Sequence, residues 1–136
     1  MRRIAQHVTM LDATATAVSA GLRVTDFRNC ILSVAGTSSI GGKLFVMGAV
    51  STSDTAAAPD FTVNRTARSA TNNWDYIEVV DLEDGAAIDG DDGITLAGNN
   101  IRLFEVNLNS FDWLAVNMTS GVAGTVTVVA AMTTNE

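Results

Sequence analysis

The residues best suited to chemistry lie in the acidic segment 81–93, which reads DLEDGAAIDGDDG. The carboxylates of Asp89, Asp91 and Asp92 are hard oxygen ligands of the kind that Ca²⁺ prefers. Their spacing differs from that of an EF-hand loop, in which acidic ligands recur at fixed alternate positions and end in a glutamate. The segment is therefore either a calcium site at these three aspartates or, more simply, a solvated acidic loop.

No other set of residues forms a catalytic motif. Two carboxylates on opposite sides of a sugar could hydrolyse a glycoside, but the acidic residues here crowd one loop. His7 is the only histidine, and no GxSxG-type motif supports a dyad with a serine or with Cys30. We expect no catalytic residue, no cofactor and no enzymatic activity.

The single cysteine, Cys30, cannot form an intramolecular disulfide, and the chain has no CxxC or Cys/His spacing for a metal. Because Cys30 begins the apolar run Cys30-Ile31-Leu32, it is expected to be a buried structural thiol.

Aromatic side chains offer a third kind of site. The faces of Trp74, Tyr76, Phe111 and Trp113 could stack on sugar rings. Tryptophan next to a turn is more often part of a sandwich core or of an interface, and this is the reading we favour.

The elements that must position these residues are strands. Of the 136 residues, 47% are hydrophobic and 17% are charged, and Thr, Val, Ser and Gly are abundant while lysine occurs once. In segment 101–108, Phe104, Val106 and Leu108 alternate with Glu105 and Asn107, which is the period of a half-buried strand. Similar patterns predict about eight strands, at residues 29–35, 43–50, 61–63, 74–82, 94–96, 101–108, 112–118 and 125–132.

This pattern predicts one all-β domain, a β-sandwich or jelly roll, over residues 21–136. Residues 1–20 are expected to be an extended N-terminal arm, and residues 51–73 a long surface excursion. The last three strands are expected to form a meander that ends in a tight hairpin at residues 119–124. No apolar run approaches the roughly 20 residues that span a bilayer, so we expect no membrane association.

Charge is divided unevenly along the chain, whose net charge is −7. Residues 1–68 hold seven basic and four acidic side chains, whereas residues 69–136 hold one basic and eleven acidic side chains. An acidic protein is unsuited to phosphate contact, so we expect no nucleic-acid partner. The residues expected to bind a partner lie in the arm and the excursion: Arg2, Arg3, Ile4, Val8, Arg65 and Arg68.

The order of these features resembles the small β-sandwich virion structural proteins of tailed bacteriophages, and capsid decoration (cement) proteins in particular. The similarity covers roughly residues 24–132. It rests on the strand-turn-strand of residues 30–50 and on the segments WDYIEV (74–79), IRLFEV (101–106), FDWLAV (111–116) and SGVAGTVTV (120–128).

The resemblance implies a homotrimer on the capsid surface of a virion, with the major capsid protein as partner and without catalytic residues. The protein would stabilise the shell by bridging capsid subunits, with the basic half and the arm toward the shell. A tail, baseplate or fibre component is the alternative, and a carbohydrate-binding module is the second alternative.

Overall fold

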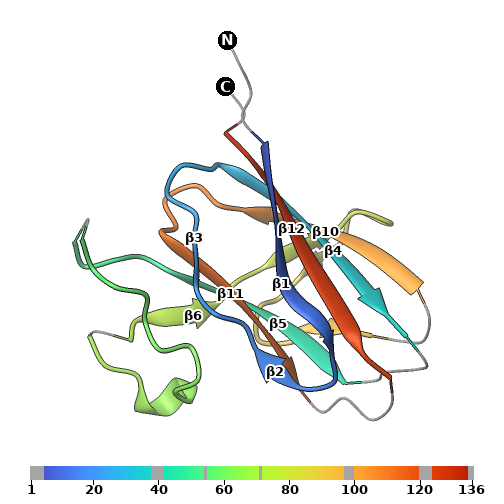
Figure 1. Cartoon of the computed structure of the whole chain (residues 1–136), viewed down its shortest axis with the longest axis horizontal. Coiled ribbons are helices and arrows are strands. Elements are labelled where there is room, and N and C mark those ends of the chain that lie inside the picture. Colours follow the sequence, from blue (N-terminus) through green and yellow to red (C-terminus); the bar gives the residue numbers. More distant parts are fainter. Residues whose placement is uncertain are drawn as a thin grey trace.

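The fold is a sandwich of two antiparallel β-sheets (Figure 1). The computed structural model describes residues 5–37, 42–53, 55–70, 72–96, 100–119 and 124–134. The expected all-β class is confirmed, and the only helix among these residues is the short 3₁₀ helix η1, Arg65–Ala67. No helix in the described ranges is long and apolar enough to cross a membrane.

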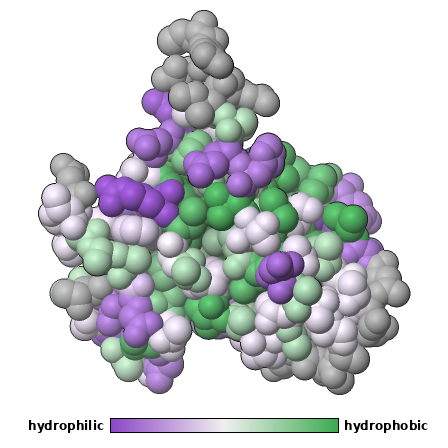
Figure 2. Space-filling model, viewed as in Figure 1, coloured by the Kyte–Doolittle hydropathy of each residue, from purple (hydrophilic) through white to green (hydrophobic). Residues whose placement is uncertain are grey.

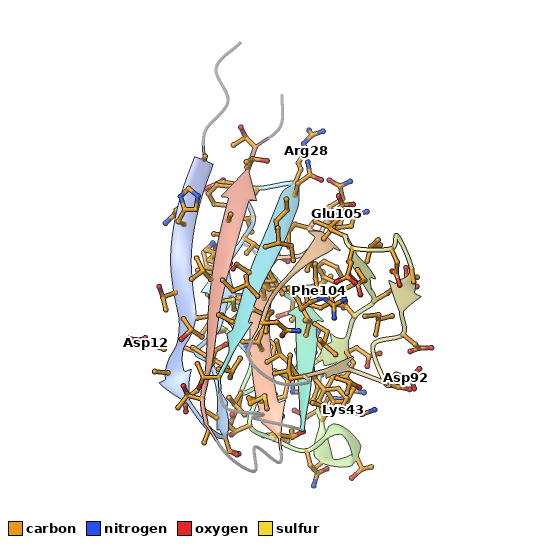
Figure 3. All side chains as sticks on the ribbon, turned by 90° about the vertical axis from the view of Figure 1, so that its right-hand side faces the viewer. Asp12, Arg28, Lys43, Asp92, Phe104 and Glu105 are labelled. Carbon is orange, nitrogen blue, oxygen red and sulfur yellow. The ribbon has the colours of Figure 1, made fainter. Side chains whose placement is uncertain are left out.

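Sheet A has the strand order β1-β12-β4-β10-β7-β8. Its four long strands run side by side in Figure 3, from β1 at one edge through β12 and β4 to β10. The strand bounds are β1 Ala5–Thr14, β4 Asn29–Gly36, β7 Val79–Asp81, β8 Ala87–Ile88, β10 Asn100–Asn107 and β12 Val126–Thr133.

Sheet B has the strand order β2-β11-β5-β6, and two short strands add to it because β3 pairs with β11 and β9 pairs with β5. Its strand bounds are β2 Ala17–Val18, β3 Leu22–Arg23, β5 Lys43–Ala49, β6 Trp74–Tyr76, β9 Ile94–Thr95 and β11 Trp113–Thr119.

The core between the sheets follows from alternation along each strand. On β12 every second residue from Val126 to Met132 is buried, and on β10 Phe104 and Val106 are buried. Leu114 and Met118 of β11 meet them from sheet B within one cluster. Burying a side chain of this size contributes about 1.5–3 kcal/mol, so this continuous apolar layer is the main source of stability.

The expected C-terminal meander is wrong. β10 and β12 lie in sheet A, whereas β11 lies in sheet B and pairs with β5. Each of these three strands has one strongly apolar face. The faces of β10 and β12 meet that of β11 across the core, so the three strands do not lie in one sheet. β11 and β12 therefore form no hairpin, and residues 120–123 of the connection lie outside the described residues.

Two other expected strands differ from the structure. Segment 74–82 is divided into β6 in sheet B and β7 in sheet A, because the chain crosses between the sheets after Tyr76. Residues 61–63 form a turn instead of a strand, in which the Asp60 carboxylate accepts a hydrogen bond from the Thr62 amide at 2.9 Å. Side-chain capping of this kind favours a turn over a strand.

The N-terminal segment is extended, and it pairs with the protein's own last strand. β1 pairs with β12 from Ala5↔Thr133 onward, with irregular register around Met10. Leu11 of β1 is buried in the main core, and Val8 packs against it. From Ala5 on, the expected arm is therefore part of the sandwich, with β1 at the edge of sheet A and β2 at the edge of sheet B.

The two halves of the sequence do not form two halves of the molecule. β1 and β4 of the basic half interleave in sheet A with β10 and β12 of the acidic half. The charge imbalance along the chain therefore does not correspond to a division between the two sheets.

Candidate interaction surfaces

The excursion between β5 and β6 covers the outer face of sheet B. Phe61 and Trp74 are buried there with Met47, Ala49 and Ala115, which point away from the main core. This second cluster forms because these alternate positions of β5 and β11 are themselves apolar. The excursion is thus a packed layer on the sheet.

Trp74 lies within this layer and is only 2% exposed. Its ring contacts Phe61 at a centroid distance of 6.2 Å and Tyr76 at 5.3 Å. The Arg68 guanidinium lies 5.0 Å from the ring centroid and 3.6 Å from the Asp75 carboxylate. Trp74 is therefore a core residue, as we favoured, and its face is not presented to a sugar ring.

Trp113 is half-buried and helps to anchor the start of the excursion. Its indole N–H donates to the Ser51 hydroxyl at 3.0 Å, and the neighbouring Asp112 carboxylate accepts from the Ser51 amide at 2.6 Å. The Arg23 guanidinium lies 5.6 Å from the Trp113 ring centroid. The indole N–H and one face of the Trp113 ring therefore already have partners within the protein.

The acidic segment is an ordered loop held by its own hydrogen bonds. The Asp89 carboxylate accepts from the Asp91 amide at 3.0 Å, and the Lys43 ammonium donates to the Asp92 carbonyl at 2.7 Å. Gly90 lies so close to the β6–β7 connection that an added Cβ would be 2.7 Å from the Tyr76 carbonyl carbon. The loop is therefore pinned to the body of the sandwich.

The structure does not group the three aspartates of the calcium hypothesis as ligands of one ion. Asp89, Asp91 and Asp92 are exposed. In the described parts of the chain, no three His, Cys, Asp or Glu side chains come together as metal ligands would. The arrangement fits the solvated acidic loop, in which carboxylates cap backbone amides.

The start of the acidic loop carries the clearest electrostatic contact. The Arg102 guanidinium of β10 donates to the Asp81 carboxylate of β7, and its Nε lies 3.1 Å from the Glu83 carboxylate. Asp81 is 7% exposed and also accepts from the Glu83 amide at 3.0 Å. This amide, with help from Arg102, lowers the pKa of Asp81 below its ordinary value.

Cys30 and His7 lie on different strands and form no dyad. Cys30 points into the core from β4, and burial raises its pKa to about 12. A thiol with so high a pKa is protonated at neutral pH and therefore unreactive. His7 is exposed on β1, opposite Ala131 of β12.

Three of the six expected partner-binding residues lie in the described part of the chain, and they come from two separate segments, β1 and the excursion. Arg2, Arg3 and Ile4 lie outside the described residues. Val8 is half-buried against the main core, and Arg68 is engaged with Trp74 and Asp75. Arg65 lies in η1 on the excursion. The expectation for these six residues stays a prediction.

The outer face of sheet A has no covering layer among the described residues, and we call it the open face. It consists of the outward residues of β7, β10, β4 and β12, together with Leu82, which directly follows β7. Four large apolar side chains are exposed on it: Ile101 by 69%, Leu103 by 45%, Leu82 by 41% and Ile31 by 40%. Figure 2 views the sandwich from the side of the edge strand β1, so the hydrophobic residues across its middle lie at that edge, and the open face is turned to the right-hand side.

Two solved structures share this fold. The SPBc2 prophage-derived protein YomS superposes with a TM-score of 0.66 at 12% sequence identity, over 98% of this chain and 96% of YomS. The PBSX exported protein XepA superposes with a TM-score of 0.72 at 13% identity, over 98% of this chain. The match covers 39% of XepA, so the chain spans about two fifths of that protein. No family model matches the chain, and no curated protein matches it.

At 12–13% identity, the likeness to YomS and XepA shows a shared fold. It extends over nearly the whole of this chain and nearly the whole of YomS. Because β1 is part of the sandwich here, the superposition covers the N-terminal strand as well as the segment from residue 24 on which the sequence resemblance rests.

The open face is the feature that the sequence reasoning missed. A signal for it was present in segment 101–108, because Ile101 and Leu103 stand in phase with Glu105 and Asn107 and not with the core residues. Two large apolar residues on the solvent side of a strand are typical of a contact surface.

Proposed function

We propose that this protein is a non-enzymatic structural component of a phage particle, and specifically a capsid decoration (cement) protein on the outer shell. The observation that carries the proposal is the end-to-end likeness to the prophage-derived protein YomS. It agrees with the independent sequence resemblance to small β-sandwich virion proteins.

The composition of the surface supports a mechanical role. The main candidate sites for chemistry are accounted for by structure, since Cys30 is buried, Trp74 is covered and the acidic loop caps itself. What remains available is a sheet face with exposed apolar side chains. A protein that binds several shell subunits stabilises the shell because more contacts must break before it opens.

The proposed partners are the major capsid protein and further copies of this chain. The trimer implied by the resemblance and the contribution of Arg2, Arg3 and Ile4 to shell binding are parts of the same proposal. The acidic loop would face solvent, where like-charge repulsion keeps particles apart.

The test is to locate the protein in purified particles by electron cryomicroscopy and to measure its copy number by quantitative mass spectrometry. A decoration protein is expected on the outer shell at a copy number comparable to that of the major capsid protein. A low copy number with density in the tail or baseplate would overturn the decoration role and establish the alternative. Absence from washed particles would overturn both.

The carbohydrate-binding alternative loses its structural basis. It requires an exposed aromatic platform, whereas Trp74 is buried and the Trp113 ring already lies beside Arg23. We do not propose it further.

A further inference from the structure

β1 is a terminal strand that is held from one side only. It pairs with β12 at the edge of sheet A, and no other described strand lies along its second edge. Of its ten residues only Leu11 is buried, while Val8 and Met10 pack partly against the main core. β1 therefore depends on β12 for its position, and few side chains anchor it.

The chain just beyond β1 is held more firmly. Two residues separate β1 from β2, which pairs with β11 in the opposite sheet. Ser19 follows at 8% exposure. Its amide donates to the Val116 carbonyl at 2.8 Å, and its hydroxyl accepts from the Val116 amide at 3.0 Å. The short connection between β1 and β2 thus joins a lightly held strand to a fixed one, which is the place of a hinge.

This hinge is strained. Ala13, near the end of β1, has a φ of +47°, which is unfavourable for a residue with a Cβ. The register of β1 with β12 shifts between Thr9 and Leu11, and again between Leu11 and Thr14. The Ala13 amide donates to the hydroxyl of Thr127 at 3.1 Å. The end of β1 is therefore bent at Ala13, and the bend returns the strand to the β12 of its own chain.

We propose that β1 exchanges between copies of this chain, so that β1 of one copy occupies the edge of β12 in a second copy. The exchanged strand makes the same pairs and buries the same Leu11, so the sheet itself is unchanged. The difference lies in the hinge, which straightens when β1 crosses to a neighbour and allows Ala13 to leave the left-handed region. Short hinges under strain favour exchange of this kind.

Proximity favours the closed form, and strain favours the exchanged form. The tether presents β1 to its own β12 at an effective concentration of about 1 mM. Relief of a left-handed alanine favours exchange by roughly tenfold at each hinge. The exchanged form is therefore expected at protein concentrations of about 0.1 mM and above. Copies held side by side on one particle meet the same condition.

This inference deepens the proposed self-association and rests on the proposed function only for its use on a particle. Reciprocal exchange between two chains gives a pair, and exchange passed from each chain to the next closes a ring, such as the trimer implied by the resemblance. The isolated protein answers the question of exchange. A failure of exchange is therefore distinguishable from absence of the protein from particles.

Cysteine trapping tests the exchange directly. His7 of β1 lies opposite Ala131 of β12, and neither is buried. One chain carries His7→Cys, a second chain carries Ala131→Cys, and the two are mixed at about 1 mM in a glutathione buffer. No single chain holds both cysteines, so a disulfide at this pair requires β1 of the first chain on β12 of the second. The expected main product is a linked dimer, at twice the 14.2 kDa of the chain.

The matched control is a mixture of His7→Cys with Val50→Cys. Val50 is 50% exposed and lies outside both strands, so this mixture reports random collision, and Cys30 does not interfere because it is buried. Ala5→Cys with Thr133→Cys repeats the test at another pair of the same strands, in case one of the first variants fails to fold. No more linked dimer in the β1–β12 mixtures than in the control would overturn the proposal.

Two hinge variants test the cause of the exchange. Ala13→Gly removes the penalty of the left-handed conformation and should raise the concentration at which half of the chains are linked about tenfold. Ala13→Val increases that penalty, because β-branched residues are poorly tolerated at positive φ, and should lower this concentration. Ala13 is exposed, so neither change disturbs the core. The same half-point for both variants would overturn the role of the hinge.

Discussion

Arg102 of β10 donates a hydrogen bond to the Asp81 carboxylate of β7 and so links the two strands where the acidic loop begins. The Glu83 amide donates to the same carboxylate, and this hydrogen bond, together with Arg102, lowers the pKa of Asp81 below its ordinary value. A depressed folded-state pKa means that the unfolded chain binds the proton more readily.

The first prediction concerns this pH dependence. The stabilisation from Asp81 is fully present above pH 4 and is lost as the pH falls through the lowered pKa of the folded state. Asp81→Asn removes the titrating carboxylate, so the variant should not show this loss of unfolding free energy at low pH. The urea midpoints of variant and wild type should therefore converge below pH 4. Asp84→Asn is the control, since Asp84 is exposed and its carboxylate accepts a hydrogen bond from the Ala86 amide. Equal pH dependence of wild type and Asp81→Asn would contradict this role.

The second prediction concerns the close approach of the acidic loop to the β6–β7 connection. Gly90→Ala would place a Cβ 2.7 Å from the Tyr76 carbonyl carbon and 2.8 Å from the Ile77 amide nitrogen. Because backbone cannot yield as a flexible side chain does, we expect a loss of about 2–3 kcal/mol in unfolding free energy.

Gly85→Ala is the matched control for Gly90→Ala. No atom lies within 4 Å of an added Cβ there, although the φ of +77° leaves a conformational penalty of about 1 kcal/mol. Chemical denaturation measures both variants. A smaller effect at Gly90 than at Gly85 would contradict the close packing of the loop.

The third prediction concerns the layer over sheet B. Phe61→Ala should lower the unfolding free energy by about 3 kcal/mol, because Phe61 is buried against Trp74. The excursion should then loosen first, so limited proteolysis should cut within residues 51–73 before the rest of the chain. Phe61→Leu keeps most of the packing and should protect the excursion. Cleavage elsewhere first in Phe61→Ala would show that the layer does not depend on this residue.

The fourth prediction concerns the N-terminal segment. Deletion of residues 1–20 removes β1 and the buried Leu11, so it should destabilise the whole sandwich by at least 3 kcal/mol. Deletion of residues 1–4 leaves β1 and its pairing with β12 and should preserve the denaturation midpoint.

Only the shorter deletion, together with Arg2→Ala and Arg3→Ala, can therefore report on shell binding. Native-like stability of the longer deletion would show that β1 is a detachable arm after all.

The sequence predicted the long strands well because each has one clearly apolar face. β4, β10, β11 and β12 all lie within two residues of their expected bounds. Alternation reports which side of a strand is buried, but it does not report which strand lies beside it. This is why β11 was expected next to β10 and β12, although it pairs with β5.

The candidate surfaces were less predictable for the same reason. The burial of Cys30 follows from local sequence, since it lies in an apolar strand segment, whereas Trp74 is buried by the layer that contains Phe61. The local pattern of segment 101–108 places Ile101 and Leu103 on the outward side of one strand, but it does not contain the register between β10 and β4, which sets Leu103 beside Ser33. The covering of sheet B depends on Phe61, in a segment that was expected to be a strand.

The pairing of Ala5 with Thr133 puts the first and last described strands next to each other at one end of the sandwich. A domain closed in this way can be spliced into a host polypeptide at a single surface position, with little disturbance of the flanking segments. In XepA, the matching fold occupies 39% of a longer chain. The same closure makes the domain suited to circular permutation and to display of a fused cargo beside the paired ends of β1 and β12.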